Sequence, residues 1–532
     1  MTDAYILARA LTLSVALSMP LVAQHEHRAD ASGALGTVHF PTSCAPAVTV
    51  PFDRAVALLH SFEFGASIRE FNAVLATDPG CAMAHWGLAM SHWSNPFAGV
   101  NRGGEQLNRG QAAVDAAKTA AGGATARERG FIDAVATLYA DHQRTDQASR
   151  IAAYERAMAD LVQREPADTE AKIFHALALV ATAPPADKTY ERQLKAGAAL
   201  EELWKAQPNH PGLAHYIIHS YDVPALASQA AAAAERYSDI APAAAHALHM
   251  PSHTFTRLGM WKESARMNRR SADAARRDGS LAEVLHASDY LTYAYLQMNQ
   301  VAPVRAILAG LPAIASRFDP SAVTGAAPGS AGVFALAAIP ARYALERRAW
   351  ADAAALQVHP SAFAHADAMT HFTRALGQVH LARRDDARAS IDTLAALQQR
   401  LLASREPYWA EQVGIQHQVA KAWFTLKEGQ VDAALDGMRS AARREDATEK
   451  SGVTPGPLTP ARELLGDMLM DIRRPADALV EYRRTLEKEP GRFRATDGAL
   501  RAATAVRDRA AIAQYTAARA RLTSSARLRA PQ

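Results

Sequence analysis

Two pairs of histidines recur in this chain at one fixed interval. The stretch LAHYIIHSYD carries His215 and His219, AAHALHMPSH carries His249 and His253, and equivalent histidines are 34 residues apart. A fixed period of about 20 to 50 residues is typical of repeat arrays, in which each unit buries its apolar face by stacking on its neighbours. The chain has 532 residues, too many for one compact core of ordinary size. We therefore expect an extended repeat array or several domains.

The composition indicates helices. Hydrophobic residues make up 49% of the chain and charged residues 21%, which is typical of a folded, soluble protein. Alanine, the best helix former, is abundant, and alternating β-branched runs are nearly absent. The formal net charge is +4, and basic residues are interspersed with acidic ones rather than gathered in a stripe with aromatics. The sequence predicts an all-α protein and no nucleic-acid partner.

The N-terminus has the layout of a secretory signal peptide. Arg9 precedes an apolar run from Leu11 to Ala23 that ends in small residues. An ordinary N-terminal helix is the alternative. No later segment is apolar for long enough to span a membrane. We predict a signal peptide over residues 1–24 and a periplasmic or secreted mature protein.

The chain has only two cysteines, Cys44 and Cys81. In an oxidising compartment two cysteines near the start of the folded region can pair, so export favours a disulfide between them. Two buried thiols are the alternative. The disulfide would tie the N-terminal lead-in to an early repeat.

Several segments align on one helix–turn–helix template. A small residue opens the second helix, a large ring follows four residues later, and proline often follows twelve residues later; Ser67, Phe71 and Pro79 show this pattern, as do Ala478, Tyr482 and Pro490. The template resembles the tetratricopeptide repeat, a helix–turn–helix unit of about 34 residues. The phrases LLHSFEF, DPGCAMAHWGLAMSHW, HMPSHTFTRLGMW and TPGPLTPARELLGDMLM are also similar to a group of exported bacterial tetratricopeptide proteins, a likeness that implies no particular activity.

The resemblance implies a helical superhelix, or α-solenoid, whose concave groove is lined by the first helix of each repeat. We expect a lead-in at 25–50, an N-terminal array with a histidine-rich groove at 51–310, middle helical repeats at 311–445, a loop at 446–460, and a C-terminal repeat and tail at 461–532.

The repeat register places the histidines in the groove. Residues three, four and seven apart share one helix face, and three consecutive first helices carry such sets. The sets are His215, His219 and Asp222; His246, His249 and His253; and His286, Asp289 and Tyr293. Stacking should bring five or six imidazoles and two carboxylates into one pocket.

These sets favour a transition-metal site over packing. Packing positions prefer apolar residues, and a cluster of unpaired imidazoles is costly to bury. Neutral imidazole is the commonest metal ligand. We predict that His215, His219, His249 and His253 bind metal, with Asp222, His246, His286 and Asp289 as further ligands or supports. A set with one carboxylate would suit iron, whereas histidines alone would favour copper or zinc.

Other residues extend the predicted groove. By their place in the repeat, Trp86 and Trp93 would wall it, His60 and Tyr293 would face it, and Arg257 would neutralise a ligand carboxylate. Pro251 lies between His249 and His253, where it should start a helix or kink one.

The sequence is compatible with two functions of different class. The first is a metal-dependent enzyme, an oxidoreductase or hydrolase, acting on a small molecule. The second is an interaction scaffold whose groove holds a peptide and whose histidines only pack. The sequence carries no glycine-rich phosphate loop, no G-x-S-x-G elbow and no H-E-x-x-H motif. The oligomeric state is not encoded in any pattern found here.

Overall fold

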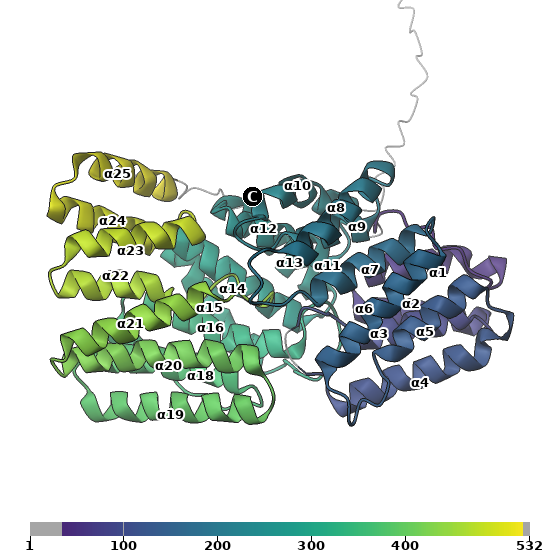
Figure 1. The fold of residues 1–532 in the computed structure, drawn as a ribbon, viewed down its shortest axis with the longest axis horizontal. Coiled ribbons are helices and arrows are strands. Elements are labelled where there is room, and N and C mark those ends of the chain that lie inside the picture. Colours follow the sequence, from purple (N-terminus) through teal and green to yellow (C-terminus); the bar gives the residue numbers. More distant parts are fainter. Residues whose placement is uncertain (1–33, 99–100, 525–532) are drawn as a thin grey trace, which may run out of the picture.

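The computed structural model describes residues 34–98 and 101–524. Every regular secondary-structure element within these ranges is a helix. The protein is an all-α solenoid of tetratricopeptide-like helix pairs, which is the fold class expected from the sequence (Figure 1). The predicted signal peptide lies outside the described residues. None of the described helices combines the length and the hydropathy needed to cross a membrane.

The N-terminal part consists of antiparallel helix pairs. They are α1 (Thr49–His60) with α2 (Phe64–Thr77), α3 (Ala82–Trp93) with α4 (Gly104–Ala120), α5 (Ala126–Thr137) with α6 (Gln147–Arg164), and α7 (Thr169–Ala181) with α8 (Glu191–Ala206). The 3-10 helix η2 (Pro46–Val48) precedes α1, and η3 (Ala121–Gly123) follows α4.

The central part carries the histidine-rich helices. It contains α9 (Pro211–Ser220), η4 (Ala227–Ala230), α10 (Ala231–Ile240), α11 (Ala245–His249), α12 (Pro251–Arg257), α13 (Trp261–Arg277), α14 (Leu281–Gln297) and α15 (Val301–Ala315). Pro251 starts a helix: α11 ends at His249, and the proline occupies the first position of α12, where its missing N–H has no intrahelical partner to lose. Pro340, by contrast, lies inside a continuous helix.

The C-terminal part is a stack of further pairs, seen on the left of Figure 1. They are α16 (Gly329–Glu346) with α17 (Trp350–Ala354), α18 (Ala364–His380) with α19 (Arg384–Ala403), α20 (Pro407–Lys427) with α21 (Val431–Asp446), α22 (Ala461–Asp471) with α23 (Pro475–Lys488), and α24 (Phe493–Val506) with α25 (Arg509–Thr523). Residues 447–460, between α21 and α22, form no helix.

Small residues opposite large rings hold neighbouring repeats together. Tyr482 is fully buried on α23 between the helices on either side of it. A Cβ atom added at Gly466 on α22 would lie 2.7 Å from the Tyr482 ring, and one at Gly498 on α24 would lie 2.5 Å from it. The ring therefore fits only against glycine at these two positions.

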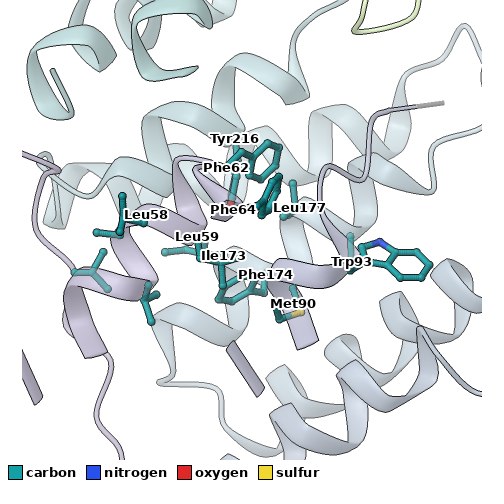
Figure 2. Packing of buried hydrophobic residues seen from close by; sticks show 14 of the residues in the cluster. Leu58, Leu59, Phe62, Phe64, Met90, Trp93, Ile173, Phe174, Leu177 and Tyr216 are labelled. Carbon is teal, nitrogen blue, oxygen red and sulfur yellow. The ribbon is translucent and has the colours of Figure 1, made fainter. Parts of the chain in front are cut away.

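Two large apolar cores draw on different parts of the chain, and the histidine-rich helices α9, α11 and α12 contribute to the first. One draws mainly on residues between Leu35 and Met267, and the other on residues between Ala282 and Tyr515. Figure 2 shows part of the first core, where Phe62, Phe64 and Tyr216 lie together. Cys44 and Cys81 form a disulfide, with Cys81 at the N-terminus of α3.

Candidate metal centre

Three consecutive first helices bring six histidines into one cluster. Helix α9 carries His215 and His219, the α11–α12 segment carries His246, His249 and His253, and α14 carries His286. The ring centroids of His215 and His246 are 5.0 Å apart, and those of His249 and His286 are 4.4 Å apart. The cluster divides into two groups of three, in each of which the candidate ligand atoms lie within 4.8 Å of one another.

The first triad consists of His215, His219 and His246. Nδ1 of His215 lies 2.6 Å from the carbonyl oxygen of His60, to which it donates, so Nε2 keeps its lone pair and has no partner. Nε2 of His219 and both ring nitrogens of His246 also lack a hydrogen-bond partner. Nδ1 of His246 lies 4.0 Å from Oε1 of Glu283. Buried polar atoms are nearly always paired, so several unpaired nitrogens in one place indicate a missing ligand.

The second triad consists of His249, His253 and His286. The side-chain amide of Asn268 donates to the carbonyl of Ser264, which fixes the orientation of the amide. Its oxygen therefore lies 2.6 Å from Nδ1 of His249 and accepts the N–H of that nitrogen. Nδ1 of His253 donates to Asp222 at 2.8 Å. Both Nε2 atoms therefore carry lone pairs, and they lie 3.0 Å apart.

Two lone pairs at this distance repel unless a metal ion or a proton lies between them. Two imidazoles that bind one ion tetrahedrally at about 2.0 Å have their nitrogens about 3.3 Å apart, close to the separation seen here. Nδ1 of His286 is likewise buried without a partner. The hydroxyl of Tyr290 lies 3.3 Å from Nε2 of His253 and donates to the carbonyl of Thr454.

Burial keeps these histidines neutral. It lowers the pKa of His215 and of His286 to about 3. It also places the pKa of His219, His246 and His249 well below the ordinary value. The pKa of His253 is lowered too, although Asp222 opposes the effect of burial. Neutral imidazole is the form that binds metal.

Asp222 supports the second triad from outside. Its carboxylate accepts from His253, from Arg257 at 3.0 Å and from Lys450 at 3.0 Å. Burial alone would raise its pKa, but Lys450, Arg257 and His253 together hold the pKa well below the usual range. A carboxylate that accepts the second N–H of a ligating histidine fixes the ring orientation and raises its basicity.

Asp289 is not available to a metal, contrary to the sequence prediction. Both of its oxygens accept from Arg342, at 2.7 and 3.3 Å, and both side chains are fully buried. Tyr293 also does not face a groove, because its fully buried hydroxyl accepts from Arg492 at 3.0 Å. Both residues lie farther along α14 than His286, where each meets an arginine from a distant segment.

The two predicted groove tryptophans are core residues. Trp86 is fully buried against Phe40, Phe131 and Phe174, because the lead-in packs over α3 through Phe40. Trp93 is buried beneath the guanidinium of Arg102, 4.0 Å from its ring centroid. It borders one small apolar pocket together with Phe62 and Tyr216, whose rings contact His215 of the histidine cluster.

His60 belongs to a separate network that the repeat register does not reveal. Its Nε2 and that of His210 each lie 2.9 Å from an oxygen of Glu170, and its Nδ1 lies 3.0 Å from the hydroxyl of Tyr216. Burial opposes ionisation of Glu170, but the two histidines outweigh it and lower its pKa. Both ring nitrogens of His60 and Nε2 of His210 therefore have partners, unlike several ring nitrogens of the triads. The grouping of Cys44, Asp78 and Cys81 cannot bind metal through sulfur because both cysteines are in the disulfide.

A cavity of about 80 Å³ lies beside the second triad and is bordered by Arg257, Lys450 and Thr454. The 447–460 segment forms part of its wall and reaches the cluster, since Thr454 accepts from Tyr290 and Lys450 donates to Asp222. The sequence predicts a loop here but gives no signal that it covers the histidines.

His365 borders the same cavity and should make stability depend on pH. Its ring stacks on Trp409 at 4.1 Å, and burial lowers its pKa to about 3. The unfolded chain therefore takes up this proton first, so the stabilisation is full above about pH 6.5 and falls as the pH drops toward 3. When the pH is lowered from 7.5 to 5, the free energy of unfolding of the native chain should fall by about 2 kcal/mol more than that of His365→Phe. Urea unfolding at both pH values measures the two changes. Exposed His359→Phe is the control, and equal losses for the native chain and His365→Phe would contradict the prediction.

No family model matches this chain, and no curated protein matches it by sequence. Among solved structures, it is similar to the APC/C hetero-tetramer Cut9–Hcn1, with 10% identity, 86% of this chain and 76% of that chain covered, and a TM-score of 0.34. It is also similar to a monomeric IFIT1 mutant with Gppp-AAAA, with 11% identity, 83% and 90% coverage, and a TM-score of 0.33. Similarity at this level says nothing about what the chain binds.

Proposed function

We propose that this chain is an exported repeat protein that holds two transition-metal ions, one in each histidine triad, and acts as a metal-dependent enzyme on a small molecule. The observation that carries the proposal is the set of buried imidazole nitrogens without partners, together with the facing lone pairs of His249 and His253. Elsewhere the pattern is different: His60 pairs with Glu170, and the single unpaired nitrogens of His210 and His365 are not gathered with others as those of the triads are. Leaving several such groups unpaired costs roughly 1–3 kcal/mol each, a cost that metal binding would offset.

Copper is the metal that this donor set suits best. Each triad offers three neutral imidazoles, and the nearby carboxylate of Asp222 is occupied by Arg257 and Lys450. Imidazole ligands suit copper and zinc, and neither triad includes a carboxylate. The nearest carboxylate to the first triad, that of Glu283, lies 4.0 Å from Nδ1 of His246 and accepts the N–H of Ala327. Two divalent ions would bring four positive charges into a buried site, while two cuprous ions would bring two. Burying less charge is less costly, which favours copper over zinc.

Three protein ligands per ion favour catalysis over a structural role. Structural zinc-type sites are closed by four protein ligands, whereas catalytic sites keep one position open. Copper bound here would supply one-electron and dioxygen chemistry. The protein would orient the ligands through Asp222, Asn268 and the His60 carbonyl, and the adjacent cavity would hold a reactant. The predicted signal peptide and the disulfide support export.

Metal analysis tests the proposal. The untagged protein would be purified from a periplasmic fraction and its metal measured by plasma mass spectrometry, alongside a variant with His215, His219, His249 and His253 changed to alanine. A control variant would change four histidines outside the cluster, His142, His359, His371 and His417. We expect about two metal ions in the native and control proteins and none in the first variant. A native protein that stays metal-free after loading with Cu(I) or Zn(II) would return the histidines to packing and leave a scaffold with a groove partner.

A further inference from the structure

The cavity beside the second triad has aromatic and charged walls. Tyr408 and Trp409 from the start of α20 and Phe334 from α16 form one side, and Glu449 and Glu489 contribute carboxylates. Lys450 and Thr454 line the cavity, and each is connected to the second triad through one further residue. Lys450 contacts Asp222, which contacts His253, and Thr454 contacts Tyr290, which lies beside His253.

The basic side chains around this cavity are already engaged. Arg257 and Lys450 both donate to Asp222. Arg462 donates to Asp446 and Glu481, and Arg484 lies 3.5 Å from Glu481. Lys488 donates to the carbonyls of Glu445 and Thr448. An anionic ligand would have to compete with these internal partners.

Three acceptors at the cavity, by contrast, lack a hydrogen-bond donor. The side chain of Glu489 is buried and makes no hydrogen bond or ion pair within the described part of the chain, although Arg257 and Lys450 attract it electrostatically. Oε1 of Glu449 accepts from Lys188 and Tyr190, but its Oε2 is buried without a partner. Oε1 of Gln416 is a third buried acceptor without a partner at the same cavity. Buried acceptors are nearly always paired, so Oε2 of Glu449 and Oε1 of Gln416 indicate a donor that the surrounding side chains do not supply to them.

We propose that this cavity binds a small primary amine in its protonated form, with the ammonium group on Glu489 and Glu449 and an aromatic body against Trp409 and Phe334. An ammonium group offers three donors and a positive charge, which match the unpaired carboxylates. Aromatic side chains attract both the ring and the cation. The inference deepens the proposed function by naming the substrate class of the metal centre, and it rests on that function only for the chemistry that would follow binding.

Binding of 2-phenylethylamine to the full chain tests this inference, with tryptophan fluorescence and calorimetry as readouts. The neutral 2-phenylethanol and the anionic 3-phenylpropionate are matched probes. We expect the amine to bind at least about tenfold more tightly than either, because a charged hydrogen-bonded pair contributes more than a neutral one. Equal or tighter binding of the anion would overturn the proposal and assign recognition to the basic residues. If 2-phenylethanol binds as tightly as the amine, the positive charge of the ligand does not contribute to recognition, which contradicts the proposal.

Two variants locate the site. Glu489→Gln should weaken amine binding about tenfold or more, whereas Glu487→Gln, two residues away and exposed, should not change it. Glu449→Gln provides a second test on another segment, and circular dichroism confirms that each variant folds. Unchanged binding in both Glu489→Gln and Glu449→Gln would refute the site. All titrations are repeated on chelator-treated protein, so that a failure of metal binding is seen separately from a failure of amine binding.

Discussion

Replacing His215 and His246 with alanine is expected to remove one of two metal ions and leave the other in place. The two residues belong to the first triad, and no histidine is shared between the triads. The second triad has its own supports, Asn268 for His249 and Asp222 for His253, and neither contacts the first triad through a hydrogen bond. Each ion should therefore depend on its own three imidazoles.

The complementary variant changes His249 and His286 and should lose the other ion. Plasma mass spectrometry gives the total metal, and titration of the stripped protein with Cu(I) against a competing chelator gives the number of sites. Each double variant should hold about half of the native metal. Complete loss in both variants, with helical content unchanged, would mean one shared site rather than two, and full retention in either would remove its triad from the metal centre.

The helical fold and the histidine cluster could be predicted because both follow from local periodicity. The interval of 34 residues places His215 beside the helix that carries His249, and the spacing within each helix places the imidazoles on one face. The same spacing places His246 and His286 on the groove-facing sides of their helices. They complete the two triads. In stacked repeats, residues one repeat length apart in the sequence lie side by side on neighbouring helices.

The partners of the other candidates could not be predicted because they come from distant segments. Asp289 shares the groove-facing register with the histidines, yet Arg342, 53 residues later, takes both of its oxygens. Tyr293 meets Arg492, 199 residues later. Trp86 is covered by Phe40 from the lead-in, which lies outside the repeat pattern. A register says which way a side chain points but not which residue fills the space opposite.

Arg342→Met is expected to destabilise the fold by about 3–5 kcal/mol, because it leaves the carboxylate of Asp289 buried without a partner. Both side chains are fully buried. Arg342 also donates to Thr454, Gly456 and Pro457, so it fastens the 447–460 segment onto α14 and α16 beside the metal centre. Urea unfolding followed by circular dichroism measures the change, and Arg347→Met, at the exposed end of the same helix, should stay within about 0.5 kcal/mol of the native chain.

The double variant Arg342→Met with Asp289→Leu separates two effects: the cost of the unpaired Asp289 carboxylate and the loss of the hydrogen bonds from Arg342 to the 447–460 segment. Removing both charges eliminates the uncompensated carboxylate, and apolar residues of similar volume can replace a buried ion pair at little cost. The double variant should therefore recover most of the lost stability. Recovery should be incomplete, because the carbonyls of Gly456 and Pro457 still lose their donor. A double variant as unstable as the single one would show that the fastening of the 447–460 segment, rather than the buried charge, sets the stability at this position.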